Sequence, residues 1–186
     1  MKNKTSKIEP TELKPIVEAA LFVSESIMTV GKLKTTVLSD FSVSKDEILT
    51  VIEALTKDYE GRGINLIKVA SGWRFQSNES LGPLLGRMWQ EPPPRYSKAL
   101  LETLALIAYK QPITRGEIED IRGVAVSSSI IKTLIERAWI QVAGYKEIAG
   151  KPALYATTNE FLDYFSLTSL SELPSSGLFD QTGNDK

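Results

Sequence analysis

The stretch Leu100–Gly123 constrains the fold of this chain more than any other, because it specifies two helices and the turn between them. Apolar residues recur at helical spacing over Leu100–Ala108, which predicts a buried helix. Gln111-Pro112 ends that helix, since the residue before a proline is driven out of the α region. Thr114 and Glu117 then form a capping box between two isoleucines in the positions of a hydrophobic staple. The sequence thus predicts where the second helix begins and the angle at which it leaves the first.

The first half of the chain carries the same device. Shifting Met28–Leu33 by 85 positions places it on Ile113–Ile118, with threonine aligned on threonine and glycine on glycine. A further capping box, inside its own staple, lies in Val43–Ile48. Each half is therefore predicted to hold three short helices.

The hydrophobic period changes after each set of helices, from helical spacing to the alternation of short strands. Three helices followed by a two-stranded hairpin is the order of a winged helix. We therefore predict a mainly α chain with small β-hairpins (α+β), built as two tandem winged-helix domains. The expected helices cover residues 11–23, 29–40, 44–60, 100–110, 114–123 and 127–138; the expected strands cover 64–69, 73–76, 140–142 and 153–155; a short helix or turn covers 81–89, and Thr157 with Glu160 opens a last helix.

Proline and polar residues place the domain boundaries. Glu91 is followed by three prolines, a composition that favours an extended spacer. The expected organisation is a disordered leader (1–10), an N-terminal winged helix (11–90), a Pro-rich linker (91–96), a C-terminal winged helix (97–170) and a disordered tail (171–186). Within the tail, Leu178-Phe179 is interpreted either as a short docking motif or as disordered filler.

Two missing residue types exclude most catalytic chemistry. The chain has neither cysteine nor histidine, which removes disulfides, thiol catalysis, imidazole bases and most zinc or iron sites. We therefore expect no metal, no cofactor and no small-molecule substrate. No apolar run is long enough to span a bilayer, and no signal peptide is recognised, so a cytoplasmic protein is expected.

The charges on the expected third helices argue against sequence-specific DNA binding. Helix 44–60 carries two lysines against five acidic residues, which would repel a duplex. Helix 127–138 carries Lys132, Arg137 and Glu136 and lacks the asparagine or glutamine used for base readout. The fold and the scattered basic residues still leave a DNA-binding transcriptional or nucleoid regulator as the alternative.

The sequence does not indicate an enzyme. Glu117 and Glu119 lie two positions apart, on different faces of a helix, so a shared carboxylate site is not expected. Ser127–Ser129 has no histidine to activate it, and serine is a good N-cap.

Protein binding is the class that is left. Aromatic side chains near the ends of elements are the candidate contacts, because such residues are enriched in interfaces. These are Tyr109, Tyr145, Tyr155, Tyr164, Trp73 and Trp89. Core packing is equally open for Trp73 and Phe75, and is expected for Trp139.

Three long runs of the second half carry a family pattern: ETLALIAYKQPITRGEIEDIRGV, LIERAWI and GKPALYATTNEFLDYFSLTSLSELP. Together they resemble the bacterial segregation and condensation protein B family, densely from Leu100 to Pro174 and in pattern only before that. Lys151 and Ala156 depart from the arginine and glycine that are usual at those places. The lysine would weaken a bidentate contact made there by an arginine.

The resemblance implies a non-enzymatic homodimer, joined principally through its N-terminal winged helices. It implies binding to the central region of the kleisin subunit, segregation and condensation protein A (ScpA), and through it to the Smc ATPase. The resulting condensin-like complex compacts and partitions chromosomes during cell division, so a nucleoid-associated location and indirect or weak DNA contact are expected. The expected kleisin contacts are Tyr109, Lys110, Arg115, Tyr155 and Tyr164, and the expected dimer contacts include Leu85 and Trp89.

Overall fold

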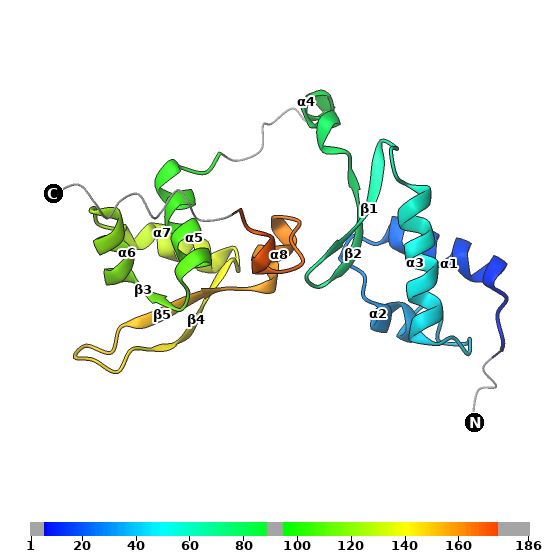
Figure 1. The fold of residues 1–186 in the computed structure, drawn as a ribbon, viewed down its shortest axis with the longest axis horizontal. Helices are drawn as coiled ribbons and strands as arrows, with labels where there is room; N and C mark the ends of the chain where they lie inside the picture. The colour runs from blue at the N-terminus through cyan, green and yellow to red at the C-terminus, as the bar shows by residue number, and fades with distance from the viewer. Residues whose placement is uncertain (1–5, 89–94, 175–186) are drawn as a thin grey trace. The chain divides into compact units, whose positions relative to one another are not determined.

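The computed structural model describes residues 6–88 and 95–174 (Figure 1). Its contacts divide the chain into two compact units, Met1–Pro92 and Pro93–Lys186. Parts of the predicted organisation lie outside the described residues: the first five residues of the leader, the dimer contact Trp89, the prolines of the linker and the tail from Ser175.

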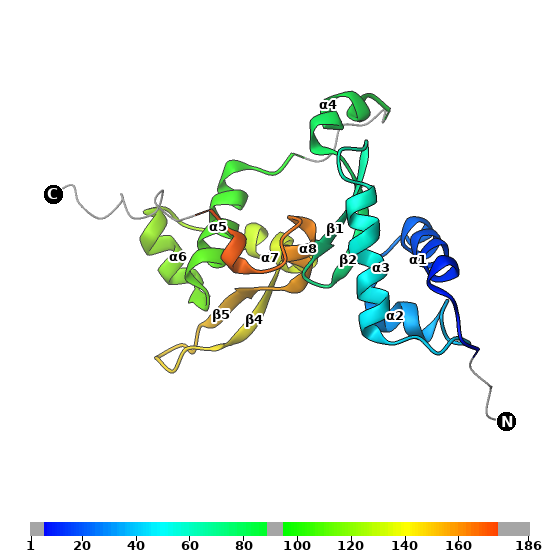
Figure 2. The same cartoon turned by 45° about the vertical axis from the view of Figure 1, so that its right-hand side comes forward.

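The first unit consists of three helices followed by an antiparallel hairpin, the predicted order of a winged helix. The helices are α1 (Pro10–Val23), α2 (Val30–Thr35) and α3 (Lys45–Asp58), and the strands are β1 (Ile64–Val69) and β2 (Gly72–Ser77). Figures 1 and 2 show α1 and α3 side by side, and their facing sides supply most of the core. The buried core residues of this unit are Leu13, Val17, Ala20, Leu21, Met28, Leu33, Leu38, Val43, Ile48, Val51, Ile52, Leu55 and Leu66.

The start signals in the sequence do begin the helices of this unit. Thr29 accepts a hydrogen bond from the Lys32 N–H at 2.9 Å at the start of α2. Ser44 and Glu47 form both halves of a capping box at the start of α3. These bonds satisfy N–H groups that have no partner inside the helix, which is why the chain turns helical at these residues.

Helix α2 is shorter than predicted, because it ends at Thr35 and not near Asp40. The Thr36 hydroxyl donates to the Lys32 carbonyl at 2.6 Å, and Leu38 N–H donates to the Leu33 carbonyl at 3.0 Å. These bonds wrap the chain into a turn that buries Leu38 completely. Burial of this leucine, which the helical period did not anticipate, gives the physical reason for the early end.

The last residues of the expected leader are placed against the first unit. Ser6 N–H donates to the Asp40 carbonyl, and Ser42 N–H donates to the Ser6 carbonyl, both at 2.9 Å. Ile8 packs against the core cluster. The described part of the leader, from Ser6 onward, is therefore held by backbone pairing and apolar contact.

The hairpin of the first unit is tied to the helices at its turn. Trp73 and Met28 exchange two backbone hydrogen bonds of 2.9 Å. This close approach requires glycine at position 72, where a Cβ atom would lie 2.4 Å from the Met28 carbonyl oxygen. Trp73 and Phe75 are half-buried against the core, so both contribute to packing.

A short helical segment follows the hairpin, as predicted. It consists of η1 (Glu79–Leu81), α4 (Gly82–Leu85) and η2 (Gly86–Met88). The predicted dimer contact Leu85 is half-buried, while Leu84 and Met88 are 57% and 75% exposed.

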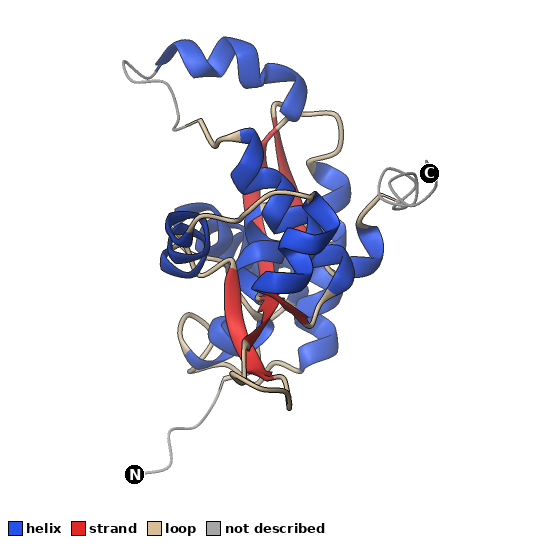
Figure 3. Ribbon diagram, turned by 90° about the vertical axis from the view of Figure 1, so that its left-hand side faces the viewer, coloured by secondary structure: helices blue, strands red, loops and turns tan. Residues whose placement is uncertain are grey.

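The second unit repeats the order, with an additional short strand. It contains α5 (Lys98–Lys110), β3 (Ile113–Thr114), α6 (Arg115–Arg122), α7 (Ser128–Glu136), β4 (Ile140–Tyr145), β5 (Ala153–Thr157), α8 (Asn159–Tyr164) and η3 (Leu170–Glu172). The strands form one antiparallel sheet in the order β3-β5-β4, drawn in red in Figure 3. The chain is thus a mixed α+β protein of two winged-helix units, as predicted.

The capping box at the centre of the sequence argument is present in the structure. Thr114 accepts from the Glu117 N–H at 3.3 Å, and Glu117 accepts from the Thr114 N–H at 2.8 Å. The staple positions Ile113 and Ile118 are buried. Gly123 ends α6 with a left-handed φ of +68°, which a glycine adopts without steric cost.

The start of the last helix lies one residue later than predicted. Thr158, not Thr157, is the N-cap, and it accepts from the Phe161 N–H at 3.2 Å. Thr157 remains in strand β5 because its N–H and hydroxyl both donate to Gln111 Oε1, at 2.6 and 3.0 Å. The contact between Gln111 and Thr157, which are distant in sequence, therefore determines that Thr158 and not Thr157 caps the helix.

The core of the second unit surrounds one tryptophan. Trp139 is 2% exposed, which confirms its prediction as a core residue. Leu173, which falls in the predicted tail, packs against this core. The buried members of the cluster are Leu100, Leu104, Leu106, Ile107, Ala108, Ile113, Ile118, Val126, Ile131, Leu134, Trp139, Ile140 and Phe161. Among the described residues no helix is long and apolar enough to cross a membrane.

Candidate protein-interaction surfaces

The five predicted kleisin contacts lie on different parts of the second unit. Tyr109 and Lys110 end α5, Arg115 begins α6, Tyr155 lies in β5 and Tyr164 ends α8. They do not form one cluster, and their surroundings differ in polarity and burial.

Tyr109 borders an apolar groove between α5 and the segment that begins with α8. The groove has a volume of about 340 Å³ and no charged residue among those that line it. We call it the α5–α8 groove; its lining residues are Leu101, Leu104, Ala105, Ala108, Tyr109, Phe161, Phe165, Leu167, Leu173 and Pro174. The Tyr109 hydroxyl donates to the Pro174 carbonyl at 2.6 Å, so the end of the described chain is fixed at the groove.

Each side of this groove combines a buried and an exposed side chain, from α5 on one side and from α8 and the residue after it on the other. Leu104 and Phe161 are buried, whereas Leu101 and Phe165 are 42% and 40% exposed. Large apolar side chains that remain in contact with water carry an unfavourable hydration free energy, which a binding partner relieves. The groove therefore has the properties of a binding site for an apolar side chain.

Tyr164 belongs to an aromatic cluster that adjoins the groove. Its ring lies 4.6 Å from that of Trp139 and 5.1 Å from that of Phe165, centroid to centroid. A hydrogen bond with Tyr96, followed by burial, raises the pKa of Tyr164 above its ordinary value. Arg137 lies over the Tyr96 ring at 4.7 Å, in cation–π geometry. Because Phe165 also lines the groove, the exposed rings of Tyr164 and Phe165 lie next to it, while Trp139 packs beneath them in the core.

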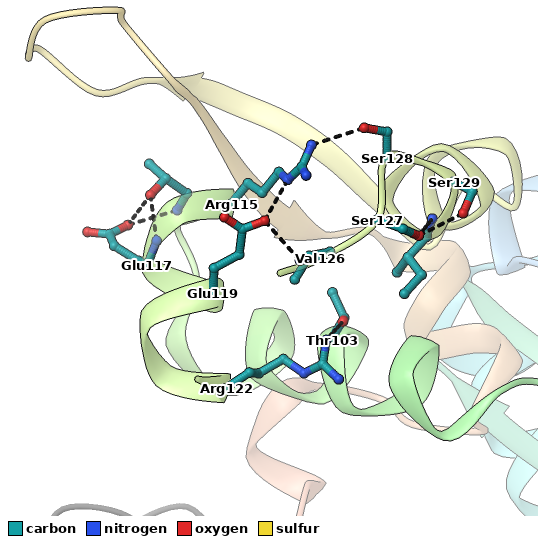
Figure 4. A network of polar contacts seen from close by, with 11 residues as sticks. Thr103, Arg115, Glu117, Glu119, Arg122, Val126, Ser127, Ser128 and Ser129 are labelled. Carbon is teal, nitrogen blue, oxygen red and sulfur yellow. Dashed lines mark hydrogen bonds and ion pairs between the residues drawn. The ribbon is translucent and has the colours of Figure 1, made fainter. Parts of the chain in front are cut away.

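Arg115 already has two partners within the protein (Figure 4). Its Nε lies 2.9 Å from Glu119 Oε1, and its Nη1 lies 3.0 Å from Ser128 Oγ. Glu119 also accepts from the Val126 N–H, and this bond, followed by Arg115, lowers the pKa of Glu119. The arrangement joins α6 to the start of α7, so Arg115 has a structural role whether or not a partner also contacts it.

Tyr155 and Lys110 differ in exposure. Tyr155 pairs with Ile113 on one side and Val142 on the other, and it is half-buried against the core. Lys110 is exposed beside a shallow hollow whose other lining residues include Glu117 and Asp120. Their roles as kleisin contacts stay predictions.

Glu117 connects the β4–β5 hairpin, the wing of the second unit, to helix α6. Lys146 Nζ, from just beyond β4, lies 2.6 Å from Glu117 Oε1, while the N–H and the hydroxyl of Thr114 donate to Glu117 Oε2. The bond from Lys146, followed by those from Thr114, lowers the pKa of Glu117 to about 2. Glu117 and Glu119 thus serve separate contacts and do not share a site.

The serine run begins a helix. Ser127 accepts from the Ile130 N–H at 3.3 Å as the N-cap of α7, which confirms the prediction (Figure 4). Among the described residues no group of three acidic side chains is arranged to hold a metal ion.

Helix α3, which corresponds to the DNA-reading helix of many winged helices, is acidic in the first unit. Its fourteen residues include two lysines and four acidic side chains.

At the end of α1, Phe22 and Val23 are 64% and 73% exposed. The helical pattern did not single out these two residues or Phe165, because periodicity alone does not show which side of a short helix is left uncovered.

Sequence comparisons relate this chain to one protein family. The family model described as segregation and condensation complex subunit ScpB matches residues 15–176. The segregation and condensation protein B homolog of Coxiella burnetii is 51% identical over 169 residues, which cover 91% of this chain and 79% of that protein. The segregation and condensation protein B of Desulforamulus reducens is 41% identical over 165 residues, 88% of each chain.

Solved structures of the family are similar to the chain at lower identity. The crystal structure of ScpB from Mycobacterium tuberculosis is 27% identical, with a TM-score of 0.41, and covers 88% of this chain and 100% of that one. A crystal structure of a dimer of the ScpB N-terminal domain complexed with a ScpA peptide is 29% identical, with a TM-score of 0.37, and covers 42% of this chain and 96% of that one. The match to the family model and the identity to the two relatives show that the chain belongs to the segregation and condensation protein B family.

Proposed function

We propose that this chain is a non-enzymatic adaptor subunit of a condensin-like complex. As a homodimer it binds the central region of the kleisin ScpA and through it the Smc ATPase, in support of chromosome condensation and partition at the nucleoid. The observation that carries the proposal is the match of residues 15–176 to the ScpB family.

The physical character of the two units supports protein binding over DNA binding. A duplex needs basic side chains to neutralise its phosphates, and α3 has more acidic than basic residues. The second unit instead offers the α5–α8 groove and the adjoining, exposed rings of Tyr164 and Phe165. Apolar and aromatic surfaces of this kind are what a protein partner uses as anchor sites.

The adaptor is proposed to act as a clamp. Ordering a flexible kleisin segment costs conformational entropy, so a substantial apolar contact area is needed to offset it. We assign kleisin binding to the second unit, through Tyr109, Lys110, Arg115, Tyr155 and Tyr164. Dimer formation is assigned to the first unit, including Leu85 and Trp89.

Titration of the purified chain with the central region of its kleisin, followed by calorimetry, tests the proposal. We expect Tyr109→Ala and Tyr164→Ala each to weaken binding at least tenfold. Lys132→Ala is the control, because the Lys132 side chain is 75% exposed on α7 and lies outside the proposed site. Absence of binding by the unmodified chain would refute the adaptor function, while unchanged affinity in a variant would remove only that residue.

The dimer assignment has its own test. Light scattering coupled to size-exclusion chromatography should give twice the chain mass for the unmodified protein and a monomer for Leu85→Asp. A control substitution at the exposed neighbour Arg87, Arg87→Asp, should leave the dimer intact. A monomeric unmodified chain at micromolar concentration would contradict the assignment.

A further inference from the structure

The described chain ends at the α5–α8 groove. Leu173 and Pro174 are its last described residues, and both line the groove. The Tyr109 hydroxyl holds the Pro174 carbonyl, which fixes the point from which the following residues start. Leu101, two helical turns along α5, remains 42% exposed at the far end.

We propose that Leu178-Phe179 of the same chain occupies this groove. These are the only two apolar side chains larger than glycine between Pro174 and Lys186. Four Cα steps separate Pro174 from Leu178, and an extended chain covers about 14 Å in that distance. Along α5, eight residues separate Tyr109 from Leu101, a rise of about 12 Å. The tether is therefore long enough to bring the pair to the exposed end of the groove.

The charges that flank the two segments are complementary in this arrangement. Asp180 directly follows Phe179. Lys98, one turn before Leu101, has a side chain that is 92% exposed and lies 3.6 Å from Glu102, whose other oxygen is bonded by Arg122 at 2.9 Å. These two cations and one carboxylate leave one net positive charge at the start of α5, where the helix dipole is also positive. An acidic residue that leaves the groove at this end meets favourable electrostatic potential.

The tether also favours this occupant over a separate molecule. A segment joined by a few residues has an effective concentration on the order of millimolar at its site, which a second copy or another protein must match from solution. Tyr109 is also one of the proposed kleisin contacts, so Leu178-Phe179 and the kleisin would compete for the groove. The inference about Leu178-Phe179 does not rest on the kleisin proposal and is tested without kleisin.

The chain has no cysteine, so a pair of introduced thiols gives a clean measurement on the full-length protein. The reporter carries Leu101→Cys and Gln181→Cys, and the rate of intramolecular disulfide formation is measured with oxidised glutathione at low micromolar protein. The matched control carries the same cysteines together with Leu178→Ser and Phe179→Ser, so the tether length is unchanged. Circular dichroism establishes that both proteins are equally folded.

If Leu178-Phe179 docks in the groove, the disulfide should form at least tenfold more slowly in the serine control than in the reporter. The rate in the reporter should not depend on protein concentration, because the reaction is intramolecular. Equal rates in the two proteins would overturn the proposal, because only the length of the tether would then matter. Cross-links between chains, with a rate that rises with protein concentration, would also overturn it and would assign the groove to a second copy.

Discussion

Glu117→Gln is expected to destabilise the second unit by about 1 kcal/mol at neutral pH. The substitution keeps an oxygen that can accept from Thr114, but it removes the charge that holds Lys146 at 2.6 Å. A fall in pKa from 4.5 to about 2 corresponds, at 1.36 kcal/mol per unit, to about 3 kcal/mol. The Glu117 side chain is 39% exposed, so solvent screening reduces the expected effect to the lower value.

The same reasoning predicts a pH dependence with a definite sign. Because the pKa of Glu117 is lowered in the folded state, its contribution is present above the unfolded value of 4.5 and is lost as the pH falls toward 2. The difference in unfolding free energy between the unmodified chain and Glu117→Gln should therefore shrink to less than about half at pH 3.

Urea unfolding followed by Trp139 fluorescence measures this difference. In a background of Trp73→Phe and Trp89→Phe, emission comes only from Trp139 in the core of the second unit. Lys146→Met should destabilise the second unit and should couple to Glu117→Gln in a double-mutant cycle.

Lys151→Met is the control for this cycle, because Lys151 lies 3.9 Å from Glu147 and both side chains are largely exposed. It should leave the stability unchanged. An equal effect of Lys146→Met and Lys151→Met, or a Glu117→Gln difference that is constant from pH 7 to pH 3, would refute the reasoning.

Two further substitutions test contacts in the two units. Gly72→Ala should destabilise the first unit by about 2–4 kcal/mol in urea unfolding, because the new methyl group would lie 2.4 Å from the Met28 carbonyl oxygen. Gly82→Ala is its control and should change the stability little, because a Cβ atom there meets nothing within 4 Å. Equal effects of the two substitutions would contradict the prediction. Arg122→Met should cost the second unit about 1–2 kcal/mol, because Arg122 is 10% exposed and bonds Glu102 at 2.9 Å across α5 and α6. Lys132→Met, at an exposed position, is its control, and an Arg122 variant as stable as that control would show that the Arg122–Glu102 pair contributes nothing.

Local signals in the sequence predicted the start of nearly every major helix. The capping boxes of Thr114 with Glu117 and of Ser44 with Glu47 depend on residues three positions apart, and both are present in the structure. Such bonds act within one turn of helix, so the sequence alone is enough to recognise them.

The features that were mispredicted depend on contacts between distant parts of the chain. Gln111 holds Thr157 in its strand and moves the last helix start to Thr158. Burial of Leu38 in the core shortens α2. The hydrophobic pattern of the residues around α2 and α8 does not indicate either contact.

The interaction surface was predictable only in its chemical class. The absence of histidine and cysteine and the acidic third helix directed the prediction toward a protein partner. The α5–α8 groove was not predicted, because Leu101 was read as part of the buried stripe of α5 and is 42% exposed. Which side of a helix stays uncovered depends on how α8 packs against it, and that packing is a tertiary property.

Co-purification from the host tests the central claim most directly. The tagged full-length chain is isolated at moderate salt after nuclease treatment, and the proteins that accompany it are identified. The adaptor function predicts recovery of a kleisin and an Smc-type ATPase in the absence of DNA. Recovery of neither protein, with association seen only while DNA is intact, would contradict the account and support a DNA-binding regulator.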